Sequence, residues 1–375
     1  MKVGIITYHN AINYGAALQA LATQETVKGL GANAEIINYT PKVISDVYKP
    51  FVFSKYGRTF KRSIIEGVRS VLSDVYYFPF ITRKNNAFKK FGDEFFDYSG
   101  KAFEKLETER ESLKKYDVCF AGSDQIWNPD ITMGFDPAYF LDFGKEDMVR
   151  AAYAASIGRD SFSEEEEQQM TDHLKRFDFI SSREVTGAGV LQGMTDKTVE
   201  TVLDPTLLIN SNAWEKVLNI KSGKGGYIFV YTLFQNEKLN EFVEKLSKEK
   251  NLPVVTINRR KIYSAEKQSF AGCDPKKFVE LIANADYIVT NSFHGTAFSV
   301  NFSKNFITFK NSARNSRITD MLSMLGIVDR VVFDADAEML KMPEIDYSSV
   351  QEKLQYERET SINYIKTVLE RAKPQ

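Results

Sequence analysis

At 375 residues the chain is longer than one ordinary hydrophobic core requires, and this length predicts two domains. Its 49 lysines and arginines nearly balance 50 aspartates and glutamates, and the net charge of −1 argues against a dedicated nucleic-acid-binding protein. Cys119 and Cys273 lie far apart, which favours free thiols over a disulfide framework. The sequence also shows no apolar leader and no membrane-spanning run, so we expect a cytoplasmic protein.

The chain opens with a predicted strand, helix and strand. Residues 3–8 form the first apolar run, a helical pattern follows, and residues 34–39 form the second run. Such a βαβ unit begins a parallel doubly wound sheet, and its first loop lies on the ligand side of that sheet. Asn13 and Gly15 of this loop are therefore candidates for ligand contact, with ordinary turn and cap chemistry as the alternative.

Residues 49–91 differ from the rest of the chain in composition. They carry ten lysines and arginines against two acids, a net charge of +8, interleaved with aromatic residues. A basic amphipathic segment of this kind can lie on an anionic membrane surface or hold an acidic, lipid-linked substrate. The alternative, which we favour, is a helical insertion that packs its aromatic side chains on the domain and leaves a basic face in solvent.

Two further strands of the first half lead into polar loops. Residues 117–122 lead to Asp124, which can serve a substrate or simply cap its loop. The last strand of this half is predicted at residues 199–204. Residues 179–184 form a predicted strand whose last residues, Arg183 and Glu184, are charged, and a helix whose glycines miss the dinucleotide-binding spacing follows it. An arginine at this position can clamp a carboxylate or phosphate, and a structural ion pair fits the pattern equally well.

The second half repeats the alternation of strands and helices. Its central stretch, residues 287–309, predicts a strand, a polar loop with His294, a helix and another strand. Free backbone N–H groups and the helix dipole at such a helix start favour a bound anion, beside which an imidazole can exchange a proton. The alternative is a capping or surface histidine. Arg314 and Arg317 follow the next strand, and Arg259 follows an earlier one.

These runs predict an α/β fold of two Rossmann-like, doubly wound domains facing across a cleft. We expect the first domain at residues 1–208 with an insertion at about 45–100, the second at 209–345, and a C-terminal helix at 346–375 that packs back on the first domain. Ligands of such folds bind at the carboxyl ends of strands. Every candidate named above falls there, which favours a functional role for His294.

No common metal or nucleotide motif occurs in the sequence. The P-loop, the Gly-x-Ser-x-Gly elbow and zinc-ligand spacings are absent, and the three histidines share no ligand spacing. Asp334-Ala335-Asp336 has the Asp-x-Asp form of metal-dependent sugar transferases, but a turn is the preferred interpretation. We therefore predict no metal site.

Several long motifs follow one another along most of residues 3 to 330. They are Thr7 to Ala20, Gly122 to Pro129, Ala152 to Ser156, Ser182 to Glu184, Val202 to Thr206 and Thr290 to Ser299. On these motifs the chain resembles the polysaccharide pyruvyl transferase family. The resemblance implies a fold similar to the GT-B glycosyltransferases. It also implies transfer of the pyruvyl group of phosphoenolpyruvate to two hydroxyls of a glycan sugar, giving a ketal and phosphate without a further cofactor.

The resemblance places Arg183 and His294 in the donor site, with Ser292 and Gly295 beside His294. Characterised relatives carry an arginine where this chain has Ser292. Either Arg314 or Arg317 then supplies the missing charge, or the donor or the reaction differs. Asp124 is a second catalytic candidate, and the candidates for the acceptor side or cleft are Asn13, Gly15 and Arg259.

Within this interpretation, His294 either protonates the methylene carbon of the donor or takes the proton of the attacking sugar hydroxyl. The expected partners are phosphoenolpyruvate and a glycan or lipid-linked sugar, at the inner face of the membrane if residues 49–91 touch lipid. Two alternatives stay open. One is a glycosyltransferase or epimerase that uses a nucleotide sugar on the same fold, and the other is a non-catalytic glycan-binding relative that has lost its donor site.

Overall fold

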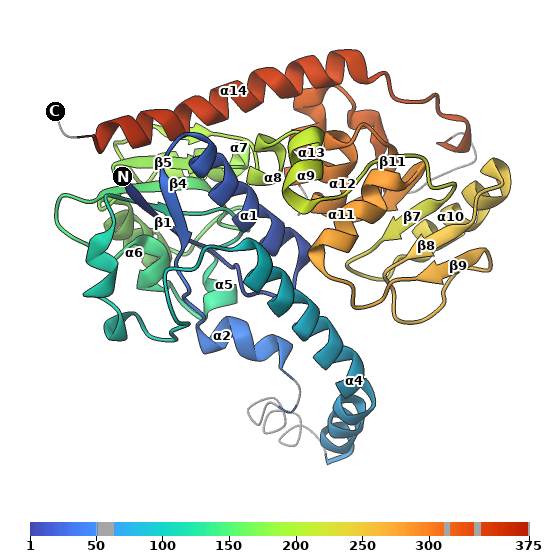
Figure 1. Cartoon of the computed structure of the whole chain (residues 1–375), viewed down its shortest axis with the longest axis horizontal. Coiled ribbons are helices and arrows are strands. Elements are labelled where there is room, and N and C mark those ends of the chain that lie inside the picture. The colour runs from blue at the N-terminus through green and yellow to red at the C-terminus, as the bar shows by residue number, and fades with distance from the viewer. Residues whose placement is uncertain (50, 52–63, 311–315, 334–338, 374–375) are drawn as a thin grey trace.

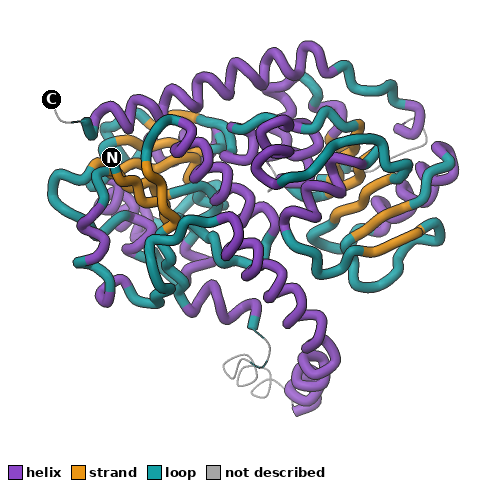
Figure 2. Tube along the Cα trace, in the orientation of Figure 1, coloured by secondary structure: helices purple, strands orange, loops and turns teal. Residues whose placement is uncertain are grey.

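The computed structural model describes residues 1–49, 51, 64–310, 316–333 and 339–373. Two parallel sheets of six strands each lie side by side, and helices surround both (Figures 1 and 2). This architecture confirms the predicted α/β class with two Rossmann-like sheets.

The first sheet has the strand order β2-β1-β3-β4-β5-β6. Its strands are β1 (Lys2–Ile6), β2 (Asn33–Ile36), β3 (Val118–Ala121), β4 (Val149–Ala155), β5 (Phe179–Ser182) and β6 (Val199–Thr201). The second sheet has the order β12-β11-β10-β7-β8-β9. Its strands are β7 (Ile228–Tyr231), β8 (Val254–Thr256), β9 (Glu266–Ser269), β10 (Tyr287–Thr290), β11 (Asn305–Phe309) and β12 (Val331–Val332).

Central strands such as β3 and β7 are buried along their whole length, as expected of parallel strands covered by helices on both faces. The helices of the first half are α1 (Tyr14–Gly29), α2 (Lys42–Ser45), α4 (Ile64–Phe95), α5 (Pro129–Thr132), α6 (Glu164–Leu174), α7 (Val185–Gln192) and α8 (Pro205–Leu208). Those of the second half are α9 (Ser211–Leu218), α10 (Glu237–Lys250), α11 (Pro275–Asn284), α12 (Phe293–Asn301), α13 (Ser316–Leu325) and α14 (Tyr347–Arg371).

Three strands differ from the sequence expectation. The strand expected at residues 179–184 ends at Ser182, because the chain turns there into α7, which Glu184 directly precedes. The strand expected to reach Asp204 ends at Thr201, because Asp204 instead caps α8 by accepting from the backbone N–H of Thr206 at 3.0 Å. Strand β9 was not predicted. It is an edge strand of sequence Glu-Lys-Gln-Ser with mostly exposed side chains, and it therefore lacks the apolar pattern by which strands are recognised.

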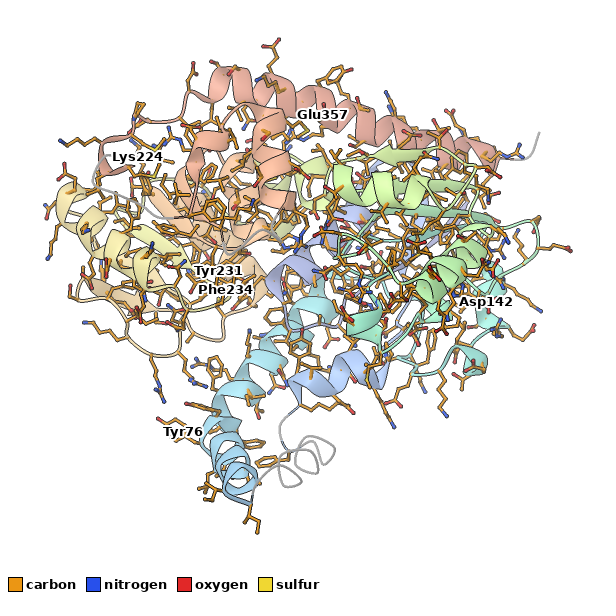
Figure 3. All side chains as sticks on the ribbon, turned by 180° about the vertical axis from the view of Figure 1, so that it is seen from behind. Tyr76, Asp142, Lys224, Tyr231, Phe234 and Glu357 are labelled. Atoms are coloured by element: carbon orange, nitrogen blue, oxygen red, sulfur yellow. The ribbon has the colours of Figure 1, made fainter. Side chains whose placement is uncertain are left out.

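The basic insertion contains the long helix α4, which extends away from both sheets (Figure 1). Its inner part packs on the core through Phe88 and Phe91. Its outer part carries exposed apolar side chains, including Leu72 at 62% and Tyr76 at 73% exposure, and Figure 3 shows Tyr76 far from the sheets. The expected packing of aromatic side chains on the domain thus holds for the inner part alone.

Helix α14 runs along both halves of the molecule (Figure 1). Near its start, Gln351 donates to the carbonyl of Val300 in the second half at 3.1 Å. Further along, Ser361 accepts from the backbone N–H of Leu203 at 2.9 Å, and the Tyr364 hydroxyl donates to the carbonyl of Ala152 at 2.8 Å. The helix therefore ties the two halves together. None of the described helices is long and apolar enough to cross a membrane.

Candidate active site

The guanidinium of Arg183 is the centre of a buried cluster of charged side chains. Arg183 lies between β5 and α7, and its side chain is 1% exposed. Its Nη1 donates to Asp204 Oδ2 at 2.9 Å and to Ser123 Oγ at 3.2 Å. Its Nη2 lies 3.5 Å from Asp124 Oδ1, and its Nε lies 3.4 Å from Glu184 Oε1. Three carboxylates thus surround one cation at the carboxyl edge of the first sheet.

His294 reaches the same cluster from the second domain. It stands in the first turn of α12, its side chain is 13% exposed, and its Nε2 lies 3.8 Å from Asp204 Oδ2. This distance is too long for a hydrogen bond. Nε2 of His294 and Nη2 of Arg183 are both buried, and neither has a hydrogen-bond partner among the described residues. A buried polar atom without a partner is costly, and both nitrogens can bind a polar atom of a ligand.

The His294 ring packs directly against Gly15 of α1. A Cβ atom added to Gly15 would lie 1.9 Å from His294 Nδ1, so only glycine permits this approach. The ring of Phe293 covers the guanidinium of Arg183 with 5.4 Å between the ring centroid and Cζ. The start of α12 therefore contacts two segments of the first domain, the one that follows β1 and the one that follows β5.

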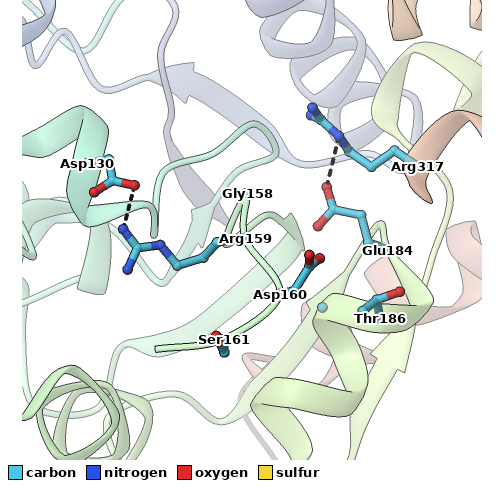
Figure 4. A pocket seen from close by; sticks show the side chains of 9 residues that line it. Asp130, Gly158, Arg159, Asp160, Ser161, Glu184, Thr186 and Arg317 are labelled. Atoms are coloured by element: carbon cyan, nitrogen blue, oxygen red, sulfur yellow. Dashed lines mark ion pairs between the residues drawn. The ribbon is translucent and has the colours of Figure 1, made fainter. Parts of the chain in front are cut away.

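Arg317 places a second guanidinium beside the cluster. It lies in the first turn of α13, and its Nε is 3.7 Å from Glu184 Oε1. Glu184 and Arg317 line a polar cavity of about 340 Å³, which also includes Gly158 and Thr186 (Figure 4). On the other side of this cavity, Arg159 is paired with Asp130 at 2.5 Å (Figure 4). The contact between Arg317 and Glu184 is thus longer than the contact between Arg159 and Asp130.

Burial and neighbouring charges set the protonation of the cluster. Burial lowers the pKa of His294 from its ordinary value of 6.5; Asp204 acts in the opposite direction, and Arg183 lowers the pKa further. Burial would raise the pKa of Asp204, but His294 and Arg183 bring it below the ordinary range. Burial also disfavours the charged form of Arg183, yet the surrounding carboxylates raise its pKa overall. At neutral pH the cluster therefore holds a neutral imidazole beside a charged arginine.

An irregular backbone at the sheet edge positions two of the polar side chains. Asp124 has φ of 78° and Ala154 has φ of 56°, both in the left-handed region that residues other than glycine rarely adopt. The register of β4 against β5 shifts between Ala152 and Ala155. After this irregularity Ser156 donates to Glu184 Oε1 at 2.6 Å. Strained backbone of this kind is concentrated at functional sites.

Several predicted site residues serve the local fold. The side chain of Asn13 caps α1 by accepting from Gly15 N at 2.9 Å and from Ala16 N at 3.3 Å. Ser292 caps α12 by accepting from Gly295 N at 3.4 Å. A Cβ on Gly295 would lie 2.5 Å from Thr290 Oγ1, so close packing explains that glycine. The capping alternative therefore describes what Asn13 does in this structure, and Ser292 caps a helix as well.

Arg259 is not brought into the cluster. Its guanidinium carbon lies 3.2 Å from the ring centroid of Tyr77 on α4 and 5.7 Å from that of Phe80. It therefore connects the second domain to the insertion. Arg314 and the stretch from Asp334 to Asp336 lie outside the described residues.

The sequence interpretation missed Asp204 and Glu184 as members of the cluster. The sequence pattern places both at the ends of predicted strands, Glu184 at the end of residues 179–184 and Asp204 at the end of residues 199–204. Both follow strands of the first sheet, so the rule that selected Arg183 could have selected them. Within the described part of the chain, no group of three or more His, Cys, Asp or Glu side chains is placed to hold a metal ion.

Comparison with known proteins gives one family match. A family model described as polysaccharide pyruvyl transferase matches residues 13–313. No curated protein sequence matches the chain significantly.

Solved structures with a similar fold include two UDP-GlcNAc 2-epimerases and a heptosyltransferase. The epimerase from Neisseria meningitidis is 9% identical with a TM-score of 0.48, and the alignment covers 99% of both chains. The epimerase from Methanocaldococcus jannaschii is 14% identical with a TM-score of 0.41, covering 97% of this chain and 93% of the other. The heptosyltransferase WaaC from E. coli is 11% identical with a TM-score of 0.40, covering 95% of this chain and 100% of the other.

Proposed function

Because the chain belongs to the polysaccharide pyruvyl transferase family, we propose that it transfers the pyruvyl group of phosphoenolpyruvate to two hydroxyls of a glycan sugar. In this reaction C2 of the donor forms bonds to both sugar oxygens, and its bond to the phosphate oxygen breaks. One hydroxyl proton ends on the methylene carbon, which becomes a methyl group, and the other leaves with hydrogen phosphate. The products are a pyruvate ketal and phosphate, and no oxidant or further cofactor is needed.

The convergence of Arg183 and His294 on Asp204 is the observation that carries this proposal. The two side chains come from different domains, and each has one buried nitrogen without a partner in the described structure. A small donor with a carboxylate and a phosphate offers oxygens to both nitrogens. A site assembled by two domains can also exclude water from the reacting atoms.

The neutral state of His294 favours the role of a base. A neutral imidazole can take the proton of an attacking sugar hydroxyl, and the imidazolium that forms is stabilised by Asp204 at 3.8 Å. The same imidazolium can then return the proton to the methylene carbon or to the leaving phosphate. Asp124 lies beside Arg183 and stays a candidate for positioning the acceptor.

The carboxylates around the cations indicate which contacts a donor would replace. Asp124 lies 3.5 Å from Arg183, and Glu184 lies 3.7 Å from Arg317, so both contacts are longer than the 2.9 Å bond between Arg183 and Asp204. An anionic donor can replace these two longer carboxylate contacts more easily than the shorter one. Arg317 is thus our candidate for the charge that relatives carry at the position of Ser292.

Phosphate release from phosphoenolpyruvate, measured across a panel of glycan acceptors, tests the proposal. His294→Ala should lower turnover by about 10²–10⁴-fold with both substrates saturating. His173→Ala is the matched control, because His173 stacks on Phe140 outside the cluster and should keep near-native turnover. Retained turnover in His294→Ala, or binding of UDP without binding of phosphoenolpyruvate, would reject this function.

The outer part of α4 suggests that the acceptor is lipid-linked and is met at the inner face of the membrane. Leu72 and Tyr76 are four residues apart and therefore share one face of the helix, and both are exposed on a segment rich in basic residues. Co-sedimentation with vesicles of anionic phospholipid tests this contact. The double variant Leu72→Glu and Tyr76→Glu should sediment less than the wild type, and equal sedimentation would reject the contact.

A further inference from the structure

A second cavity, of about 240 Å³, lies between the two domains. Its wall includes Asn13 and Tyr14 at the start of α1, Lys84 of α4, Tyr231 at the end of β7 and Asn258 after β8. Tyr231 is labelled in Figure 3. The cavity therefore receives side chains from the carboxyl edge of both sheets and from the insertion.

This cavity is a neighbour of the proposed donor centre. Tyr14 directly precedes Gly15, against which the His294 ring lies, and the ring of Tyr231 lies 5.9 Å from that of Tyr14, centroid to centroid. A ligand group held in this cavity could therefore belong to a molecule whose other end lies at His294.

Lys84 brings an uncompensated positive charge to the cavity. Its Nζ lies 5.3 Å from the ring centroid of Tyr14 and 5.6 Å from that of Phe88, and no carboxylate pairs with it in the described structure. None of the described residues that line the cavity is acidic. By contrast, Lys28 of the first domain is paired with Asp97 at 2.7 Å. Burial lowers the pKa of Lys84, as expected when a cation leaves water without a counterion.

Asn258 adds a second donor without a partner. Its side-chain Nδ2 is buried, and no hydrogen bond to it is found among the described residues. Its backbone is satisfied, with the N–H donating to Thr256 Oγ1 at 3.2 Å. An ammonium and an amide N–H₂ without acceptors favour a ligand that is anionic and rich in oxygen.

We propose that this cavity binds a phosphate or diphosphate group of the acceptor, with Lys84 Nζ and Asn258 Nδ2 as donors. The identity of the group as part of the acceptor rests on the proposed function, whereas the anion site itself does not. The volume is below the range of about 300–1,000 Å³ typical of pockets for a whole drug-sized ligand, so it suits one small group. A sugar phosphate and a lipid-linked sugar diphosphate share this chemistry.

Calorimetric titration with inorganic pyrophosphate tests the site without requiring turnover. Lys84→Gln should weaken binding at one site by about tenfold or more, the loss expected for one charge-assisted contact. Lys84→Arg should retain most of the binding, because it keeps the charge. Lys90→Gln, on an exposed position of the same helix, should bind as the wild type does. Arg317→Gln identifies any pyrophosphate bound at the donor centre, because only that site should weaken in this variant.

The kinetic arm compares a sugar 1-phosphate, a lipid-linked diphosphate of the same sugar and its uncharged methyl glycoside. Lys84→Gln should raise KM for a charged acceptor about tenfold with little change in kcat, and should leave KM for the methyl glycoside unchanged. The charged acceptor that the wild type uses distinguishes a free from a lipid-linked source.

Equal pyrophosphate binding by the wild type, Lys84→Gln and Lys90→Gln would overturn the site, whatever the turnover. Selective loss in Lys84→Gln without any phosphate release from phosphoenolpyruvate would keep the anion site and reject the proposed reaction.

Discussion

Arg183 and Lys84 are two cations between the domains, the first with a buried side chain and the second partly buried, and they differ in what surrounds them. Arg183 is held by Asp204, with Asp124 and Glu184 close by, whereas no described carboxylate pairs with Lys84. A caged guanidinium is fixed in place before any ligand arrives and is part of the folded structure. An unpaired ammonium gains its counterion only when a ligand binds. In the proposed function Arg183 therefore belongs to a positioned reaction centre, and Lys84 to a binding subsite.

The largest effect is expected where the caged cation is removed. Arg183→Gln leaves three carboxylates without their shared cation, and it should lower the free energy of unfolding by about 3–5 kcal/mol and abolish turnover. Chemical denaturation followed by circular dichroism measures the loss. A loss below about 1 kcal/mol would show that the cage contributes little to the fold.

The contact between Gly15 and His294 gives the next largest effect. Gly15→Ala places a methyl group where the imidazole lies, so the ring must move, and turnover should fall by about 10²-fold. Gly29→Ala is the matched control on the same helix, because a Cβ there meets nothing within 4 Å. Equal turnover of the two variants would separate His294 from the chemistry.

The pH dependence of kcat/KM tests the protonation of His294 in the free enzyme. Because its pKa is lowered from 6.5, the imidazole stays neutral at neutral pH, and the rate should fall only as the pH drops below 6.5. Arg317 contributes to the lowered pKa, so Arg317→Gln should move this acid limb to higher pH. An acid limb centred above 6.5 in the wild type would contradict the assignment.

Folding stability should follow the same sign. Below pH 6.5 the unfolded chain binds a proton at His294 that the folded chain resists, so stability should decline as the pH falls from 6.5 through the lower pKa of the folded state.

The smallest effect sharpens the contrast with Arg183. Lys84→Met removes a cation that has no carboxylate partner in the described structure, so the free energy of unfolding should change by less than about 1 kcal/mol or rise slightly. The same denaturation experiment measures it. A destabilisation as large as that of Arg183→Gln would mean that Lys84 has a structural partner and would remove the distinction between the two cations.

The sequence rule that ligands meet the carboxyl ends of strands located much of the cluster. It selected Arg183, Asp124, His294 and Arg317, because each lies between a strand and the next helix or in the first turn of that helix, and the alternating pattern predicted both sheets. Local sequence patterns predict where a strand ends. This was sufficient to select the residues of the cluster that lie just after such an end.

Features that depend on tertiary contacts were not accessible in this way. The strand-end rule can select Asp204, but nothing local shows that this carboxylate joins a guanidinium and an imidazole from two domains. Lys84 was counted within a solvated basic face, but the docking of α4 between the domains turns it toward a cavity. Arg259 follows the strand rule, yet the same docking directs it to Tyr77.

Direct binding of phosphoenolpyruvate tests the central claim that the two domains assemble a donor site around Arg183 and His294. Calorimetric titration at neutral pH should give one phosphoenolpyruvate per chain, and Arg317→Gln should weaken this binding by about tenfold while Lys84→Gln leaves it unchanged. Absence of saturable binding, or equal binding by the wild type and Arg317→Gln, would contradict the account.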